Sequence, residues 1–244
     1  MAKVINVTFL PDLAPPESLQ GKTAVVIDVL RATTTIVTAL GCGAARVLPC
    51  LEVEDARRIA AEMNEPLLGG ERGGLRIDGF DLGNSPAEYV ESRVSGKAIV
   101  FTTTNGTRAL QWCRHADSVL IGAFVNLSAV CRRLADTPSI ELVCAGTNGQ
   151  VTREDILVAG AIVARIQKES TVLGDEARIA AAAWAEVEAF LTAGMSLAAC
   201  LHDSRGGRNL ILTQQEADID LAAVVDRFDC VPELKLEDWS VCLR

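Results

Sequence analysis

Short apolar stretches rich in β-branched residues recur along the chain, and each is followed by apolar positions at helical spacing. Continuous apolar runs of this length are typical of strands that are buried on both faces of a sheet. The predicted strands are Thr23–Asp28, Lys97–Phe101, Ser118–Ile121 and Ser139–Cys144. Strands that alternate with helices predict an α/β fold with three layers, α/β/α, around a largely parallel or mixed central sheet.

Helical periodicity and start signals predict the helices between and after these strands. The predicted helices are Thr33–Leu40, Val53–Asn64, Pro86–Arg93, Gly106–His115, Asn126–Ala135, Glu154–Ser170, Asp175–Ala193 and Gln215–Phe228. Ser85, Pro86 and Glu88 form the pattern of an N-cap, a first-turn proline and a capping box. We expect residues 1–244 to form a single α/β domain, and two lobes within it stay an open alternative.

The composition excludes several classes of protein. The net charge is -9 and no run of Lys or Arg occurs, so neither nucleic acid nor an anionic membrane surface is an expected partner. The cysteines form no Cys-x-x-Cys pair, which argues against structural zinc. The start of the sequence lacks the apolar stretch of a signal peptide, and no apolar run approaches the roughly 18 residues of a membrane span. We therefore expect a cytoplasmic protein.

Charged residues stand where predicted strands pass into helices. Asp28 ends a strand and Arg31 follows it, while Glu154 and Asp155 begin a later helix. Such turns meet at the carboxyl edge of a parallel sheet, where backbone N–H groups bind anions, although the same residues also serve as ordinary helix caps. Adjacent residues point about 100° apart on a helix, so at most one of Glu154 and Asp155 is expected to reach a metal directly.

A glycine-rich segment, Gly69–Gly74, carries two charged residues, Glu71 and Arg72. Its glycine content disfavours a helix or a central strand, and we interpret it as a loop that faces a ligand. Asn84 and Ser85 follow soon after it. Carboxylate and amide oxygens are hard ligands, so this part of the chain favours magnesium.

Hydroxyl and amide side chains follow two more strands, in the segments FTTTNGT and CAGTNG. Such turns can surround phosphate or sulfonate oxygens, and they also fit an N-cap with an Asn-Gly turn. The candidate anion-binding residues are Thr103, Thr104, Asn105, Gly106, Thr107 and Asn148.

Five segments in order resemble the consecutive motifs of the 2-phosphosulfolactate phosphatase (ComB-like) family. They are VVIDVLRATTTI, GERGGLRIDGFDLGNSPAEY, FTTTNGT, CAGTNG and the EDILVAG helix. The resemblance covers nearly the whole chain. It implies Mg²⁺-dependent hydrolysis of 2-phosphosulfolactate, a small anionic phosphate ester, to 3-sulfolactate and inorganic phosphate, a step of coenzyme M biosynthesis.

The resemblance also implies roles for the candidate residues. The catalytic residues would be Asp28, Glu71, Glu154 and Asp155, with Asp28, Glu71 and Glu154 as the metal ligands. The substrate-binding residues would be Arg31, Arg72, Asn84, Ser85, Thr103, Thr104, Asn105, Gly106, Thr107 and Asn148.

Two other functions stay open at this point. One is a non-catalytic sensor that binds a phosphorylated or sulfonated metabolite, although anion binding alone does not need the four carboxylates. The other is a haloacid-dehalogenase-like phosphatase with Asp28 as nucleophile, but Leu30 stands where that superfamily has its second aspartate. Direct attack by water, a covalent phosphoenzyme and assembly into a homo-oligomer are not decided by the sequence.

Overall fold

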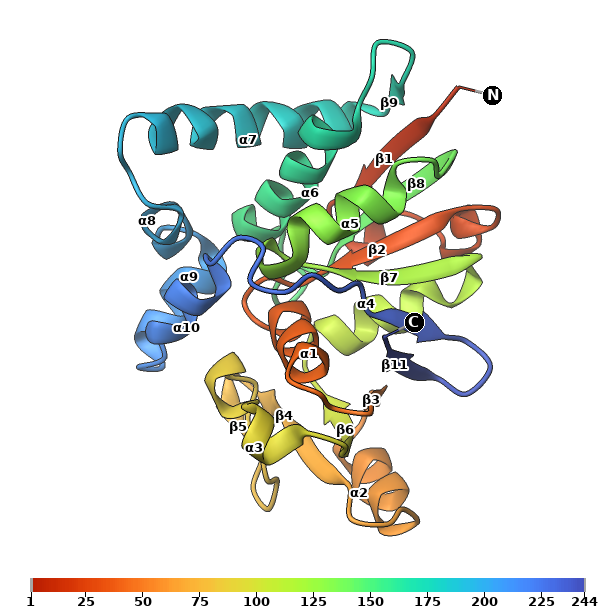
Figure 1. Ribbon diagram of the computed structural model, residues 1–244, viewed down its shortest axis with the longest axis vertical. Coiled ribbons are helices and arrows are strands. Elements are labelled where there is room, and N and C mark those ends of the chain that lie inside the picture. Colours follow the sequence, from red (N-terminus) through yellow and green to blue (C-terminus); the bar gives the residue numbers. More distant parts are fainter. Residues whose placement is uncertain (1, 244) are drawn as a thin grey trace.

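The computed structural model describes residues 2–243, and its centre is one large mixed sheet (Figure 1). The strand order is β5-β4-β6-β3-β11-β10-β7-β2-β8-β1-β9. The strands are β1 Val4–Thr8, β2 Thr23–Ile27, β3 Arg46–Pro49, β4 Leu67–Arg72, β5 Leu75–Arg76, β6 Ala98–Thr102, β7 Ser118–Gly122, β8 Ser139–Cys144, β9 Val172–Leu173, β10 Glu233–Lys235 and β11 Ser240–Cys242. The four predicted strands are confirmed as β2, β6, β7 and β8.

The sheet is parallel except at β5 and at the C-terminal hairpin. The strands β10 and β11 pair with each other in antiparallel fashion and lie between β7 and β3, antiparallel to both. The last strands in the sequence therefore fill the middle of the sheet, as Figure 1 shows for β11. These short antiparallel strands make the sheet mixed, which was one of the two predicted possibilities. Each is only three residues long, too short for its hydrophobic periodicity to be recognised in the sequence.

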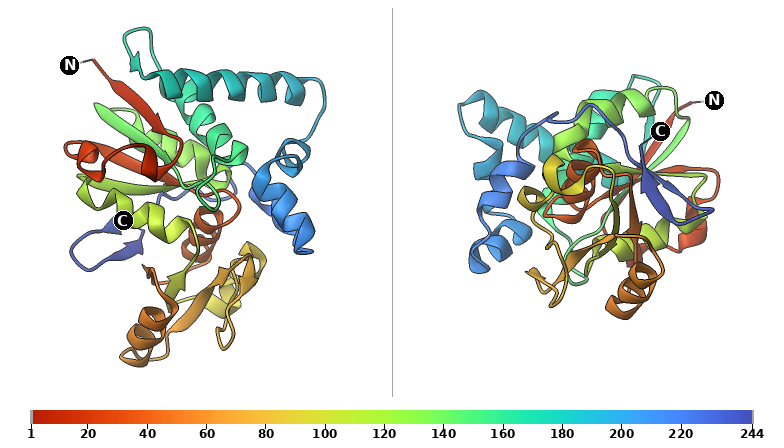
Figure 2. Two further views of the ribbon diagram at one scale, coloured as in Figure 1. Left: turned by 180° about the vertical axis from the view of Figure 1, so that it is seen from behind. Right: turned by 60° about the horizontal axis from the view of Figure 1, so that its bottom comes forward.

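Helices cover both faces of the sheet, which confirms the three-layer arrangement (Figure 2). The central strand β2 shows why: Val25 and Ile27 pack into one hydrophobic cluster, while Ala24 and Val26 pack into another on the opposite face. The helices are α1 Ala32–Gly41, α2 Val53–Ala61, α3 Glu91–Val94, α4 Gly106–Trp112, α5 Leu127–Leu134, α6 Arg153–Ile166, α7 Asp175–Thr192, α8 Leu197–His202, α9 Arg205–Leu212 and α10 Ala217–Ala222.

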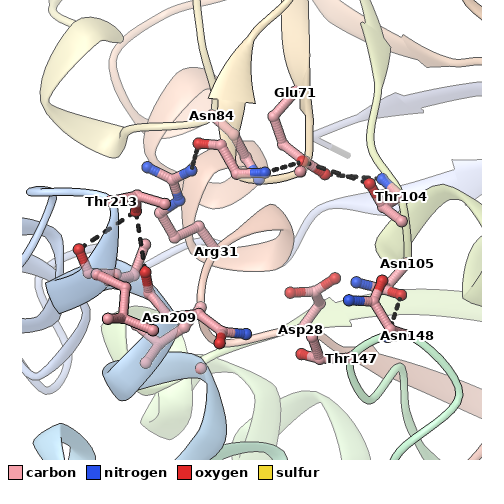
Figure 3. A pocket seen from close by; sticks show the side chains of 16 residues that line it. Asp28, Arg31, Glu71, Asn84, Thr104, Asn105, Thr147, Asn148, Asn209 and Thr213 are labelled. Carbon is pink, nitrogen blue, oxygen red and sulfur yellow. Dashed lines mark hydrogen bonds between the residues drawn. The ribbon is translucent and has the colours of Figure 1, made fainter.

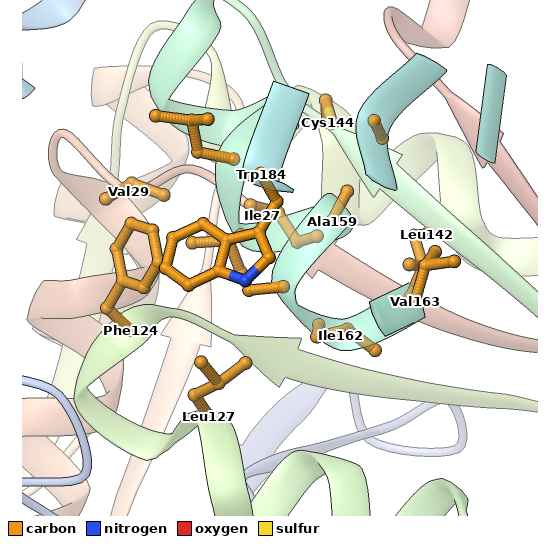
Figure 4. Packing of buried hydrophobic residues seen from close by; sticks show 14 of the residues in the cluster. Ile27, Val29, Phe124, Leu127, Leu142, Cys144, Ala159, Ile162, Val163 and Trp184 are labelled. Atoms are coloured by element: carbon orange, nitrogen blue, oxygen red, sulfur yellow. The ribbon is translucent and has the colours of Figure 1, made fainter. Parts of the chain in front are cut away.

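The larger cluster fixes helices α5, α6 and α7 to one face (Figure 4). Phe124 and Trp184 lie against each other there, with ring centroids 5.7 Å apart. Gly160 of α6 allows α7 to approach closely, because a Cβ at that position would lie 2.0 Å from the Ala180 carbonyl oxygen. Across residues 2–243, no helix has both the length and the apolar character to cross a bilayer.

One predicted helix, Pro86–Arg93, is wrong as a continuous element. The chain forms a 3₁₀ turn at Pro86–Glu88, leaves the helical conformation at Tyr89 and resumes as the short α3. Tyr89 turns into the core, where it is 1% exposed and donates a hydrogen bond from its hydroxyl to the Gly83 carbonyl. The predicted capping box is also absent, because the Ser85 hydroxyl bonds to Asp218 instead.

The predicted helix Gln215–Phe228 is shortened to α10, Ala217–Ala222. The chain leaves the helix because the backbone N–H groups of Asp226 and Phe228 bond to the carbonyls of Phe124 and Val125. Tertiary hydrogen bonds to a neighbouring segment thus replace the helical ones. The preceding helices α8 and α9 were not predicted at all.

Candidate active site

A cavity of about 280 Å³ opens at the carboxyl edge of the sheet, where the turns after β2, β4, β6 and β8 meet helix α9 (Figure 3). This is the place where ligands bind in open α/β sheets. Its lining consists of Asp28, Leu30, Arg31, Glu71, Gly73, Gly74, Asn84, Thr104, Asn105, Thr147, Asn148, Gly206, Asn209, Leu210, Leu212 and Thr213.

Asp28 comes directly after β2 and lies 7% exposed at the floor of the cavity. Its Oδ1 accepts a hydrogen bond from the Ala32 N–H at 3.2 Å, whereas Oδ2 has no hydrogen-bond partner within residues 2–243. Burial, together with the negative charges of Glu71 and Glu154, raises the pKa of Asp28 to about 7. Three acids are therefore close enough to act on one another.

Glu71 is held rigidly at the end of β4. Its Oε1 accepts a bond from the Thr104 N–H at 2.8 Å, and its Oε2 accepts bonds from the Gly74 N–H at 2.7 Å and the Thr104 hydroxyl at 3.3 Å. The side chain is 6% exposed. These bonds join the turn after β4 to the turn after β6 and fix the carboxylate toward the cavity.

The expectation of a loop over the whole of Gly69–Gly74 is wrong, because its first four residues belong to β4. The glycines allow two strands to lie unusually close: a Cβ on Gly70 would lie 1.9 Å from the Thr102 carbonyl oxygen, and Gly70 has φ +138°. Gly73 and Gly74 form the tight turn to β5 and do line the cavity. The inference that this segment faces a ligand thus applies to Glu71, Gly73 and Gly74.

Glu154 and Asp155 begin α6 and point to different surroundings. Glu154 is 1% exposed, accepts a bond from the Gly206 N–H at 3.0 Å through Oε1, and has no partner for Oε2 within residues 2–243. Burial raises its pKa. Gly206 itself lines the cavity, so Glu154 lies just behind the wall that α9 forms.

Asp155 is fully engaged inside the protein. It accepts bonds from the Val29 N–H at 2.9 Å, the Gly146 N–H at 3.0 Å and the Thr152 hydroxyl at 2.9 Å. Burial, followed by the charges of Glu154 and Asp28, raises its pKa well above the usual value. Because its bonds tie the turn after β2 to the turn after β8, Asp155 supports the site and is absent from the cavity lining.

The two candidate arginines lie in different places. Arg31 lines the cavity and is 3% exposed. Arg72 does not line it: its guanidinium donates to the carbonyls of Glu71 and Leu51 and to the Thr102 hydroxyl. Arg72 therefore fastens β4 to Thr102 at the end of β6 and to the segment at Leu51, and it does not reach the cavity.

The hydroxyl and amide candidates divide in the same way. Thr104, Asn105 and Asn148 line the cavity, and the Asn105 Oδ1 accepts a bond of 3.0 Å from the Asn148 N–H. Thr103 and Thr107 are buried and bond to each other at the start of α4. They shape the turn without reaching the cavity.

Gly106, Asn84 and Ser85 complete the candidates. Gly106 lets α4 approach Asp28, since a Cβ there would lie 2.9 Å from the Asp28 Oδ2. Asn84 lines the cavity, and its buried Oδ1 has no partner within residues 2–243. Ser85 lies outside the lining and donates its hydroxyl to Asp218.

Helix α9 supplies a wall of the cavity that sequence reasoning missed. Gly206, Asn209, Leu210 and Leu212 line it, and Ser204 caps the helix by accepting a bond from the Gly207 N–H at 3.0 Å. The signal was the serine that precedes a short apolar pattern, but the paired glycines concealed the helix.

The model of the 2-phosphosulpholactate phosphatase family matches residues 8–237. The chain belongs to this family. It is 42% identical over 222 residues to a probable 2-phosphosulfolactate phosphatase of Thermotoga petrophila, which covers 91% of this chain and 93% of the relative. It is 41% identical over 229 residues to a protein of the same description from Symbiobacterium thermophilum, which covers 91% and 94%. The resemblance read from the five motifs is confirmed.

Membership of the 2-phosphosulfolactate phosphatase family places the chain among the phosphoric monoester hydrolases, so the expected enzyme class is also confirmed. The family match spans every strand and turn that builds the cavity, from the end of β1 to β10.

The acids of this phosphatase-family site fit a magnesium ion with few protein ligands. Within residues 2–243, no group of three or more His, Cys, Asp and Glu side chains is arranged to hold a metal by itself. Mg²⁺ is commonly bound through one or two carboxylates, with waters and substrate phosphate as the other ligands. Two buried oxygens without a hydrogen-bond partner in the described part of the chain, Asn84 Oδ1 and Glu154 Oε2, are the hard donors that such an ion and its waters prefer.

Proposed function

We propose that the chain is a Mg²⁺-dependent phosphatase that hydrolyses 2-phosphosulfolactate to 3-sulfolactate and inorganic phosphate. One observation carries the proposal: a chain that matches the family over residues 8–237 places two buried acids, Asp28 and Glu71, in the lining of one cavity, and the charge of a third, Glu154, acts on Asp28 from behind the wall. Buried carboxylates that lie close together repel one another when they are ionised. Their ionised forms are therefore unfavourable unless a cation binds near them. Relatives at 40% to 42% identity are described as probable 2-phosphosulfolactate phosphatases, which supports the substrate.

Of the three candidate ligands, Asp28 and Glu71 line the cavity and would hold magnesium directly. Glu154, behind the wall that α9 forms, would reach the ion through a water. When bound, the ion polarises a phosphoryl oxygen and offsets the negative charge that develops in the transition state. Glu71 is the most rigid of the three because Gly74 and Thr104 already donate to its oxygens. That rigidity fixes where the phosphoryl group lies relative to the turn after β6.

The rest of the cavity supports binding of an anion. The substrate carries phosphate, sulfonate and carboxylate groups, whereas the protein has a net charge of -9, so positive potential has to be local. Arg31 provides a cation, and Asn105, Asn148 and Asn209 provide neutral amide groups along the lining. These groups would orient the substrate so that its phosphate faces the acids.

Attack by water requires an acceptor for its proton. Among the three candidate acids, the oxygens with no hydrogen-bond partner within residues 2–243 are Asp28 Oδ2 and Glu154 Oε2, and they are the candidates to orient the water. We assign Asp28 a ligand role and not that of a nucleophile. The reason is that Leu30 lines the cavity where a phosphoaspartate mechanism would use a second acid to protonate the leaving group.

Single-turnover hydrolysis in heavy-oxygen water tests this assignment. Direct attack places the label in the released phosphate and leaves the protein unlabelled. A phosphoaspartate would leave label on the Asp28 carboxylate, which mass spectrometry of the peptide that contains Asp28 would detect, and that result would overturn the ligand assignment. The proposal includes a cytoplasmic location. A substrate with this many charges does not cross bilayers, so the enzyme has to be in the compartment that contains the substrate.

A further inference from the structure

Arg31 is the only cationic side chain among the described residues that line the cavity. Its position therefore decides where the cavity can neutralise a substrate anion. Arg31 also lies near acids that could attract it, since its charge acts to lower the pKa of Asp28 against the effect of burial. A guanidinium that paired with Asp28 would compete with a cation for that carboxylate.

A buried acid from the C-terminal part of the chain holds Arg31 instead. The Nη1 of Arg31 donates to Oδ2 of Asp218 on α10 at 2.7 Å, and the two side chains are 3% and 5% exposed. Nη1 also donates to the Gln215 side-chain oxygen, and Nη2 donates to the Gly74 carbonyl at 2.8 Å. Figure 3 shows Arg31 between Asn84 and Thr213, above Asp28.

These contacts leave part of the guanidinium available. An arginine has five N–H donors, and three of those of Arg31 bond to Asp218, Gln215 and Gly74. The Nε–H and one Nη2–H have no hydrogen-bond partner within residues 2–243. A planar group with three bonds made has a fixed orientation, so the two remaining donors have a fixed direction too.

The same network reaches a candidate metal ligand. Gln215 donates to the Gly74 carbonyl at 2.9 Å, while the Gly74 N–H donates to Oε2 of Glu71 at 2.7 Å. The second oxygen of Asp218 accepts a bond of 2.6 Å from the Ser85 hydroxyl, so Asp218 itself is fixed from two sides. Helix α10 is thus connected to the turn that presents Glu71.

We propose that Asp218 is a positioning residue that holds Arg31 away from Asp28 and directs its free N–H groups toward the substrate anion. Gln215 assists by bonding to both Arg31 and the Gly74 carbonyl. The choice of a phosphate ester as the ligand rests on the proposed function, whereas the contacts of Arg31 do not depend on it. The consequence is that a helix far along the sequence, which touches no substrate, sets the affinity for anions.

Binding of inorganic phosphate in the presence of Mg²⁺ tests the proposal without any turnover. Isothermal titration calorimetry would compare the full chain with Asp218→Asn and with the control Asp220→Asn, which removes the same charge from an exposed position on α10. We expect the Asp218 variant to bind phosphate about 10- to 100-fold more weakly, the range for loss of one charge-assisted bond. The control should stay within about twofold.

A double-mutant cycle shows whether Asp218 acts through Arg31. Arg31→Gln alone should weaken phosphate binding, and adding Asp218→Asn to it should change the dissociation constant by less than about threefold. If the two losses multiply, or if Asp218→Asn binds phosphate like the control, the proposal is overturned. If Asp218→Asn does not fold, Gln215→Met removes a bond to Arg31 from a partly exposed position and should weaken binding in the same cycle.

The kinetic readout separates this inference from the proposed function. With 2-phosphosulfolactate as substrate, Asp218→Asn should raise KM by the same factor as the phosphate dissociation constant while kcat changes less. A wild-type chain that binds phosphate but releases none from the ester would contradict the proposed function. The cycle in phosphate binding would then still decide the role of Asp218.

Discussion

Replacement of Asp28 by asparagine should stabilise the metal-free protein while it removes activity. Asp28 is buried, and its charge is opposed by Glu71 and Glu154. Asparagine keeps the shape and can still accept the bond from the Ala32 N–H, which now uses Oδ1 at 3.2 Å. The substitution therefore removes an unfavourable charge at little cost in packing.

The magnitude follows from the pKa of Asp28, which burial and the neighbouring acids raise from 3.8 to about 7. A rise of that size corresponds to about 4 kcal/mol at most. Because the pKa is higher in the folded chain, the cost is absent below about pH 4, grows as the pH rises toward 7 and is constant above it. Asparagine must itself bury an amide, so we expect a gain of about 1–3 kcal/mol at pH 8.

Thermal unfolding in chelator at pH 8 and at pH 4.5 measures this effect. For a chain of this length, about 1–3 kcal/mol corresponds to a rise in Tm of roughly 2–10 °C. The rise should shrink markedly at about pH 4.5, where little of the cost remains. The control is Asp12→Asn at an exposed position. An Asp28→Asn variant that melts below the wild type at pH 8, with a difference that does not depend on pH, would refute the reasoning.

Three further substitutions test the supporting residues. Asp155→Asn leaves buried N–H donors without an acceptor and should cost about 2–5 kcal/mol in urea unfolding, whereas a loss below about 0.5 kcal/mol would show that its bonds are dispensable. Arg72→Ala should lower the free energy of unfolding by about 1–3 kcal/mol with KM within about threefold, and a large rise in KM at unchanged Tm would instead return Arg72 to the anion site. Gly70→Ala should prevent folding, because its Cβ would lie 1.9 Å from the Thr102 carbonyl oxygen. The control Gly73→Ala, whose Cβ would have no atom within 4 Å, should fold with a modest loss of stability. Equal soluble yields of the two variants would contradict this account.

The parts of the fold that the sequence predicts are those with strong local signals. Strand β2 and its neighbours are continuous apolar runs, and Asp28 follows β2 as a break in polarity that is easy to see. The parallel strands then place Asp28 near Glu71, since Asp28 follows β2 and Glu71 lies near the end of β4, at the same edge of the sheet. Functional residues that lie at the ends of strands can therefore be predicted from a single sequence.

The parts that could not be predicted depend on contacts between distant segments. Asp218 lies in the predicted helix Gln215–Phe228, but nothing near it in the sequence indicates that it meets Arg31, 187 residues away. Arg72 stands in a motif beside Glu71 but points the other way, because successive residues of a strand face opposite sides. Thr103 and Thr104 also differ in the turn before α4, because Thr103 bonds to Thr107 while Thr104 lines the cavity.

Release of inorganic phosphate from 2-phosphosulfolactate by the purified chain, measured with Mg²⁺ and after exhaustive chelation, tests the central claim most directly. The account predicts equimolar phosphate and 3-sulfolactate with Mg²⁺, loss of release by at least about 100-fold after chelation, and recovery when Mg²⁺ is restored. Undiminished release without divalent metal would contradict the proposed role of Asp28, Glu71 and Glu154. A folded chain that binds the ester but releases no phosphate in Mg²⁺ would contradict the proposed function itself.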